Sequence, residues 1–276
     1  TAPAAGIQAN VPALTVNDTT TTIAFAGREW YVISTGSGGV APNSGHLTLL
    51  AKDSFGKSEF RIGQNIAPID TTGWKQYSGD TWWYQGTFTQ PNDYNDSTLM
   101  RTLATAADAM PVSEAALITA RDIGTDGIGG LAVNGQKLWP LSLAEYQNMG
   151  PLSGDAFSDY SWLRSPYNVI SAYVAVSGGT YSSGPVSPPP GLTVRPALHL
   201  NLTSVLFTSD AAAGSGKSLA TAGGALVGAT APTQNLKFTM RNSAQTLVVL
   251  ATTAQSTQSG AILSFSYAGA TMGTNQ

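Results

Sequence analysis

The sequence contains no cysteine and few charged side chains. Only 11% of its 276 residues are Asp, Glu, Lys or Arg, against about 25% in an average globular domain. The absence of cysteine excludes disulfides, thiolate nucleophiles, zinc fingers and iron–sulfur clusters. A formal net charge of −3 offers no basic surface to nucleic acid or to an acidic membrane.

Long apolar runs are missing as well, since none approaches the ~20 residues that a membrane helix needs. Hydrophobic residues nevertheless make up 42% of the chain, which excludes a disordered, charge-rich protein. We therefore expect a globular protein with a real core and no membrane insertion. The length suits one large domain or two ordinary ones.

The first residues, Thr1–Gly6, are small and lack an initiator methionine, which resembles a terminus left by signal-peptide cleavage. The low charge and the many Thr, Ser, Gly and Ala residues are typical of secreted proteins. We predict an extracellular or cell-surface location. A processed cytosolic protein is the alternative.

The composition changes near Asp210. All six tryptophans lie at or before Trp162, and no carboxylate side chain follows Asp210. Ala211–Gly216 is typical of a linker. We therefore predict an extended segment at 1–22, a first domain at 23–208 and a second domain at 211–276.

The second domain is predicted to be all β. Apolar and polar residues alternate in Leu236–Arg241 and again in Leu263–Tyr267, and Gln245–Thr252 is apolar and β-branched. Short strands at this spacing favour a small immunoglobulin-like sandwich, with one strand fewer than usual.

The first domain is predicted to be α+β. Strands are expected at 23–25, 29–34, 46–52 and 192–202, and helices at 96–110 and 113–123. Asp96 or Ser97 would cap the first helix, and Ser142 with Glu145 forms a capping box for a third, short one.

Several segments of the first domain resemble an uncharacterised secreted family of Gram-positive anaerobes. The most specific are Trp162-Leu163-Arg164-Ser165-Pro166 and Val194-Arg195-Pro196-Ala197-Leu198-His199-Leu200. Weaker similarities lie at Glu29–Ile33, Leu47–Asp53, Asn95–Leu103 and Leu138–Glu145. The resemblance implies a C-type-lectin-like fold over 23–208, related to formylglycine-generating enzymes. Those enzymes need cysteines, so their chemistry does not carry over, and the family supplies no catalytic residue.

The residues alone also predict no catalytic site, no metal and no cofactor. Only His46 and His199 could serve as imidazole bases, and no serine nucleophile motif accompanies them. The carboxylates select no glycosidase pair. Oxygens near Asn92–Asp96 could bind calcium, but a turn followed by a helix cap is the preferred interpretation of this stretch.

Two arginines occupy the strongest motifs. Arg164 and Arg195 are flanked by apolar residues, so we expect them to be partly buried and to need carboxylate or backbone-carbonyl partners. Glu114 and Glu145, each near a helix start, are the expected carboxylates of these structural ion pairs.

The predicted ligand surface is Tyr167–Gly191, which we expect to form exposed loops. Its composition of Tyr, Ser, Gly and Asn is common in adaptable binding loops. The candidate binding residues are Tyr167, Asn168, Tyr173 and Tyr181.

Two classes of function follow. The first is a non-enzymatic structural protein of the cell exterior, a homo-oligomer or polymer in which segment 1–22 of one copy completes a sheet of the next and so builds a head-to-tail filament. The second is an adhesin or lectin-like module that binds a glycan or a surface protein through 167–191. An enzyme is a third, weaker interpretation.

Overall fold

The computed structural model describes residues 14–34, 46–77, 79–124, 131–187 and 191–202, together with the backbones of strands at 205–210, 236–240, 249–251, 256–257, 260–261 and 265–267. Residues 1–13 of the predicted N-terminal segment and the predicted linker Ala211–Gly216 lie outside these residues.

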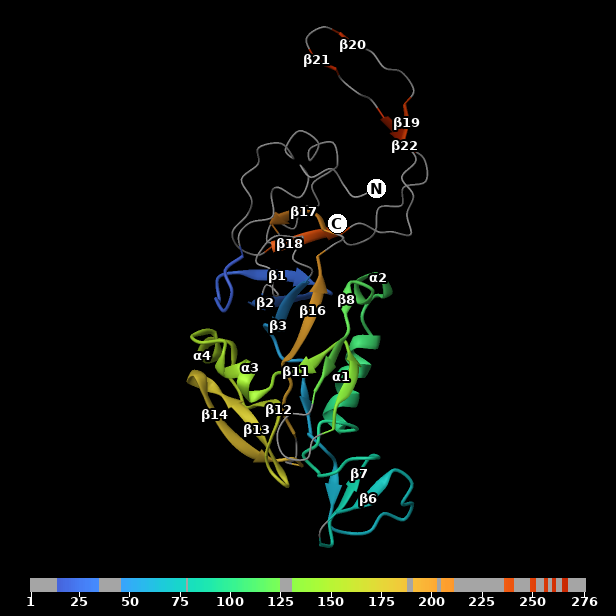
Figure 1. Ribbon diagram of the computed structural model, residues 1–276, viewed down its shortest axis with the longest axis vertical. Helices are drawn as coiled ribbons and strands as arrows, with labels where there is room; N and C mark the ends of the chain where they lie inside the picture. The colour runs from blue at the N-terminus through green and yellow to red at the C-terminus, as the bar shows by residue number, and fades with distance from the viewer. Residues whose placement is uncertain are drawn as a thin grey trace.

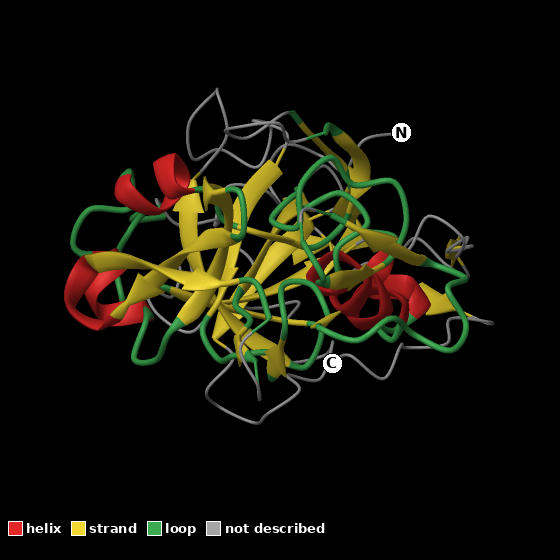
Figure 2. Ribbon diagram, turned by 90° about the horizontal axis from the view of Figure 1, so that it is seen from below, coloured by secondary structure: helices red, strands yellow, loops and turns green. Residues whose placement is uncertain are grey.

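Strands dominate the described part of the chain, and its helices are short. Figure 2 shows the helices on two sides of a strand-rich centre. The helices are α1 (Thr98–Asp108), α2 (Val112–Ala115), α3 (Leu143–Gln147), α4 (Leu152–Ala156) and the 3₁₀ turn η3 (Ser177–Gly179). None of these helices has the length and apolar character that a membrane span requires.

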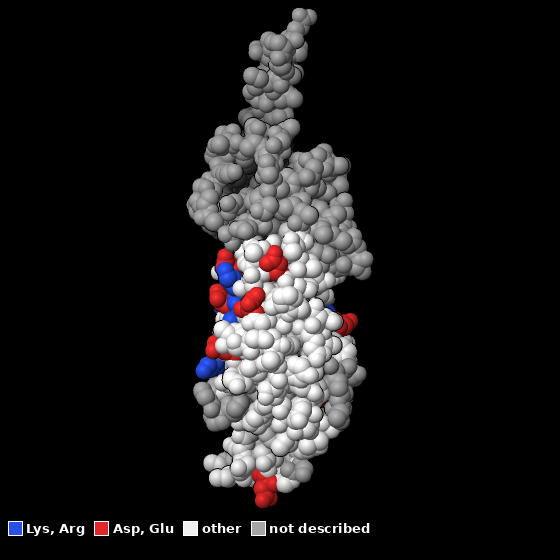
Figure 3. All heavy atoms as spheres, turned by 90° about the vertical axis from the view of Figure 1, so that its left-hand side faces the viewer, with Lys and Arg blue, Asp and Glu red and all other residues white. Residues whose placement is uncertain are grey.

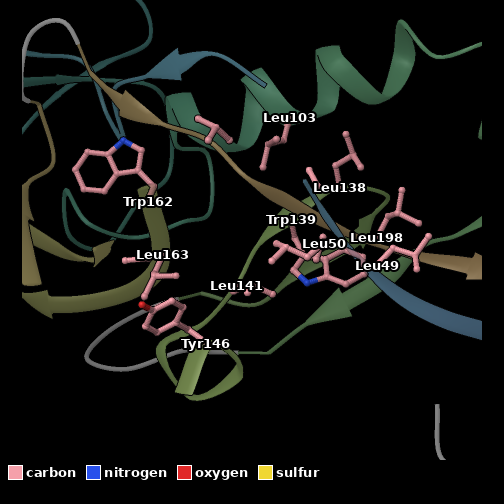
Figure 4. Packing of buried hydrophobic residues seen from close by; sticks show 14 of the residues in the cluster. Leu49, Leu50, Leu103, Leu138, Trp139, Leu141, Tyr146, Trp162, Leu163 and Leu198 are labelled. Atoms are coloured by element: carbon pink, nitrogen blue, oxygen red, sulfur yellow. The ribbon is translucent and has the colours of Figure 1, made fainter. Parts of the chain in front are cut away.

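The larger sheet has the strand order β11-β16-β3-β2-β1-β18-β17, with β8 paired to β16 (Figure 1). Its strands are β1 (Thr22–Phe25), β2 (Arg28–Ser34), β3 (His46–Ala51), β8 (Ile118–Thr119), β11 (Trp139–Pro140), β16 (Pro196–Asn201), β17 (Val205–Asp210) and β18 (Leu236–Met240). Leu47, Leu49, Leu198 and Leu200 are fully buried on the antiparallel pair β3–β16, as the period-two pattern predicts. Figure 4 shows Leu49, Leu50 and Leu198 packed beside Trp139 in this core.

The larger sheet extends past the predicted domain boundary. β18 comes from the region assigned to the second domain, yet Ile23 of β1 pairs in parallel with Leu236 of β18. β18 also pairs antiparallel with β17. The two predicted regions are therefore joined by backbone hydrogen bonding rather than by a linker alone.

The helix predicted at 113–123 is wrong over most of its length. Only Val112–Ala115 is helical, and the chain then forms β8 and β9 (Arg121–Ile123). Ile118 pairs with Leu200 of β16 and is 7% exposed. Burial of a β-branched residue against the sheet thus outweighs the local helix signal.

The smaller sheet has the order β14-β13-β12-β15-β4. Its strands are β12 (Ser161–Asn168), β13 (Ser171–Val176), β14 (Thr180–Pro185), β15 (Leu192–Thr193) and β4 (Lys57–Ser58). The expectation of exposed loops over 167–191 is therefore wrong for most of that range. β13 alternates buried with half-buried residues because its inner side chains, Ala172 and Val174, face the core.

The other strands form small ladders. β5 (Gly63–Gln64), β7 (Trp82–Tyr84) and β6 (Trp74–Gln76) make a projecting three-stranded arm, at the bottom of Figure 1. β9 pairs with β10 (Val133–Gln136). In the predicted sandwich region, β19 (Val249–Ala251) pairs with β22 (Phe265–Tyr267), and β20 (Ser256–Thr257) with β21 (Gly260–Ala261).

The described end of the predicted donor segment packs on its own domain. Leu14 is 5% exposed and belongs to the core. The backbone N–H of Asn17 donates to the carbonyl of Val32 on β2 at 2.8 Å. Residues 14–22 are thus bound within the same chain.

Candidate functional site

Three of the four predicted ligand-binding residues come together on adjacent strands. The ring centroids of Tyr167 and Tyr173 lie 5.3 Å apart, and those of Tyr173 and Tyr181 lie 5.7 Å apart, both edge to face. Tyr167 on β12 and Tyr181 on β14 are about half exposed, at 50% and 48%, and Tyr173 between them is half-buried. We call these three residues the tyrosine strip.

The surroundings of the tyrosine strip are exposed and uncharged. β14 is the edge strand of the smaller sheet, and five of its six residues are exposed. Val169 and Ile170, in the turn between β12 and β13, are 47% and 49% exposed. No charged residue and no histidine occurs between Ser165 and Val194. Figure 3, seen from the side on which β14 and α4 lie in Figure 1, shows the charged side chains gathered in the upper part of the described region and a largely uncharged face below them.

The fourth predicted residue, Asn168, shapes the turn below the strip. Its Oδ1 accepts a hydrogen bond from the backbone N–H of Ile170 at 3.0 Å. Its side chain therefore closes the turn between β12 and β13, a common role for asparagine.

Asn92 anchors the same turn through its side-chain amide. This residue is 1% exposed, and its Nδ2 donates to the backbone carbonyls of Asn168 and Ser171, the second at 3.1 Å. The sequence suggests Asn92 only as an oxygen for calcium and gives no sign of this anchoring role, because its partners lie more than 75 residues away.

The carboxylate oxygens near Asn92 accept hydrogen bonds from neighbouring loop residues. Asp93 Oδ1 accepts from the N–H groups of Asn95 and Leu131, and Asp96 Oδ2 accepts from the Thr87 hydroxyl at 2.8 Å. Ser97 caps α1 by accepting from the N–H of Met100 at 2.9 Å. The described residues hold no cluster of three His, Asp or Glu side chains that could bind a metal ion.

Arg164 lies beside Glu145. Its Nη1 is 2.5 Å from Oε2 of that carboxylate and also donates to the Pro140 carbonyl at 2.9 Å. The second oxygen of Glu145 lies 2.6 Å from Nη1 of Arg121. Burial alone would raise the pKa of Glu145, but the hydrogen bond from Arg164 and the two guanidinium charges hold it below its usual value.

Arg195 has different partners. Its Nη1 donates to the backbone carbonyls of Lys52 and Ala51. Burial lowers its pKa, and the nearest charges that oppose this effect include Asp53. Glu114 lies in the first turn of α2. Arg164 thus pairs with Glu145, whereas Arg195 donates to backbone carbonyls, the other kind of partner expected for a partly buried arginine.

Arg61 is a central residue that the sequence does not reveal. Its side chain is fully buried and stacks 4.1 Å from the centroid of Phe88. Burial lowers the pKa of Arg61 to about 10. Its three nitrogens donate to six backbone carbonyls, those of Tyr84, Gln85, Pro91, Asp93, Asn95 and Asp96. One guanidinium thus organises the whole loop that presents Asn92.

The two histidines are neighbours on adjacent strands. The rings of His46 and His199 lie 4.3 Å apart, and His199 also contacts Trp139 edge to face at 4.7 Å. Burial, followed by the charges of His46 and Arg121, lowers the pKa of His199 to about 4. These contacts with aromatic rings are typical of a packed, structural imidazole.

Comparison with protein-family models, with curated proteins and with solved structures gives no significant match. The family resemblance therefore stays a prediction.

Proposed function

We propose that this chain is a non-enzymatic extracellular binding module, an adhesin or lectin-like protein whose ligand stacks on the tyrosine strip. The observation that carries this proposal is the edge-to-face contact of Tyr167, Tyr173 and Tyr181 across three adjacent strands of an uncharged surface. Tyrosine offers an apolar ring and a polar hydroxyl while losing little conformational entropy on binding.

The chemistry of the surface selects the ligand. Ser183 on β14 is exposed and pairs directly with Tyr173, so it shares the face of the rings and supplies a hydroxyl donor and acceptor there. With no charge between Ser165 and Val194, the surface suits a neutral glycan or an uncharged protein patch, and it gives no electrostatic attraction to nucleic acid.

The finer fold assignment belongs to the same proposal. We infer a C-type-lectin-like first domain and an immunoglobulin-like second domain. Support comes from the sequence resemblance, whose two most specific motifs contribute strand β12 and the region from β15 to β16, and from the β-rich architecture with few helices.

The test is binding of neutral polysaccharides on an array, compared between variants. Tyr181→Ala and Tyr167→Ala are expected to weaken binding at least tenfold, because each removes a stacking surface. Tyr160→Ala is the matched control, since Tyr160 is 57% exposed but lies before β12. Equal losses in all three variants, or no binding of any neutral glycan by the folded wild-type chain, would contradict the proposal.

A second candidate function is self-assembly into an extracellular filament by strand pairing. β14 favours it, because this exposed edge strand lacks the charged residues that commonly prevent pairing with another chain. The strand expected to pair between copies is now β14 rather than segment 1–22. Described residues 14–22 contact their own domain, and β1 is already paired on both sides.

Negative-stain electron microscopy tests the second candidate. Ser182→Lys places a charge on the edge strand and is expected to abolish filaments, whereas Thr105→Lys adds the same charge at an exposed position of α1 and should leave them intact. Filaments that persist in Ser182→Lys would exclude assembly through β14.

A further inference from the structure

A small cavity lies beside strand β12, the strand that carries Tyr167. It is lined by residues from three regions, which include Asn92, Tyr94, Ile123, Val133, Arg164 and Pro166. Its volume of about 10 Å³ is close to the smallest space that holds one water molecule.

Asn92, one of the residues that line this cavity, carries an unpaired oxygen. Both carbonyls that Asn92 contacts can only accept, so they fix the amide with its Nδ2 toward the turn. The opposite atom, Oδ1, is buried and has no hydrogen-bond partner among the described residues. Turning the amide over would set its oxygen against two carbonyl oxygens.

Tyr94, a second residue of the lining, also carries an unpaired group. The residue is 6% exposed, and its hydroxyl is buried without a partner in the described part of the chain. Burial raises the pKa of this hydroxyl, although the charge of Arg164 acts in the opposite direction. The group is therefore a neutral O–H that can both donate and accept.

We propose that this cavity binds a single water molecule that donates to Asn92 Oδ1 and exchanges a hydrogen bond with the Tyr94 hydroxyl. Two buried polar groups left unpaired cost more free energy than the immobilisation of one water. The lining also contains one carboxylate, Asp93, and one guanidinium, Arg164, so a neutral guest is favoured over an ion of either sign. The water completes the polar contacts of the residue that holds the β12–β13 turn.

Tyr94→Phe tests the proposal through the sign of its effect on the urea unfolding midpoint. With water bound, the variant loses a hydrogen bond, and its midpoint falls. In a dry cavity the variant would lose only a buried, unpaired hydroxyl, and its midpoint would stay or rise. Tyr146→Phe is the control, because the Tyr146 hydroxyl donates to the Thr180 carbonyl at 2.8 Å and its loss must lower the midpoint.

A crystal structure of the wild-type chain tests the same site directly. Ordered density within hydrogen-bonding distance of both Asn92 Oδ1 and Tyr94 Oη supports the proposal. An empty cavity, or density that refines as an ion, overturns it. Both measurements are independent of any ligand on the tyrosine strip, and they keep their meaning if no glycan binds.

Discussion

The Oε2 atom of Glu145 lies 2.5 Å from Nη1 of Arg164, and this contact joins helix α3 to strand β12. Arg164 is nearly buried, with 6% of its side chain exposed, whereas 25% of the Glu145 side chain is exposed. The carboxylate also completes the capping box of α3 by accepting from the N–H of Ser142 at 2.9 Å. One side chain therefore serves a helix start and two guanidinium groups.

Replacing Glu145 with Gln is expected to lower the free energy of unfolding by about 2–3 kcal/mol, because it leaves a buried guanidinium without its counter-charge. Urea denaturation measures the change. Glu29→Gln is the control, since the Glu29–Lys52 pair is well exposed and is worth less than about 1 kcal/mol. Similar losses in the two variants would show that burial of Arg164 does not set the size of the effect.

Stability should fall as the pH decreases from about 6.5 to about 4 because of His199. The folded pKa is about 4, against about 6.5 in an unfolded chain. Between these values the unfolded state binds more protons than the folded state, so acid favours unfolding. Above about pH 6.5 His199 is neutral in both states, and stability no longer depends on pH through this group. The expected loss is roughly 1–3 kcal/mol. His199→Gln should flatten this part of the profile of stability against pH. Protonation of Glu145, whose pKa is lowered in the folded state, reduces stability only below about pH 4.5. An unchanged slope in His199→Gln would refute the assignment.

Arg61→Lys is expected to destabilise the protein by about 3 kcal/mol or more. An ammonium group cannot reach six carbonyls spread around a planar guanidinium, so several buried carbonyls lose their donor. Arg101→Lys is the matched substitution at an exposed site, where the ion pair with Asp96 spans 3.6 Å and is worth less than about 1 kcal/mol. Thermal unfolding followed by circular dichroism distinguishes the two variants, and equal melting temperatures would contradict the role of Arg61.

Gly191→Ala should lower the free energy of unfolding by about 3 kcal/mol, because backbone strain and a steric clash add at this position. The residue has φ +86°, and an added Cβ would lie 2.6 Å from the backbone carbon of Ser58, a contact that only a backbone shift relieves. Gly27→Ala isolates the first effect, since Gly27 has φ +68° with open space around it, and it should cost about 1 kcal/mol. Unfolding titrations of both variants check the difference.

Local sequence signals predicted the parts of the fold that local physics determines. Ser97 and Ser142 cap their helices as expected. The alternation in Leu236–Met240 forms β18, and His46–Ala51 forms β3. Each of these features depends on residues a few positions apart, so the pattern is readable in a single sequence.

The parts that could not be predicted depend on distant partners. Nothing near Ile23 indicates that Leu236 lies beside it, because a parallel pair leaves no turn sequence. Arg61 looks like any surface arginine until the carbonyls between Tyr84 and Asp96 are placed around it. The tyrosines of the candidate site were selected by composition, but their contact arises from the register of β13 with β14.

The parallel pairing of β1 with β18 has a consequence for biosynthesis. A ribosome releases β1 before β18, the neighbour that covers its outer edge, and most of the described strands lie between the two in the sequence. Contacts between segments so far apart in the sequence form slowly, so the nascent chain carries an unpaired β1 edge until β18 has been synthesised. A prematurely terminated product that lacks β18 would keep that edge permanently and would be prone to aggregate.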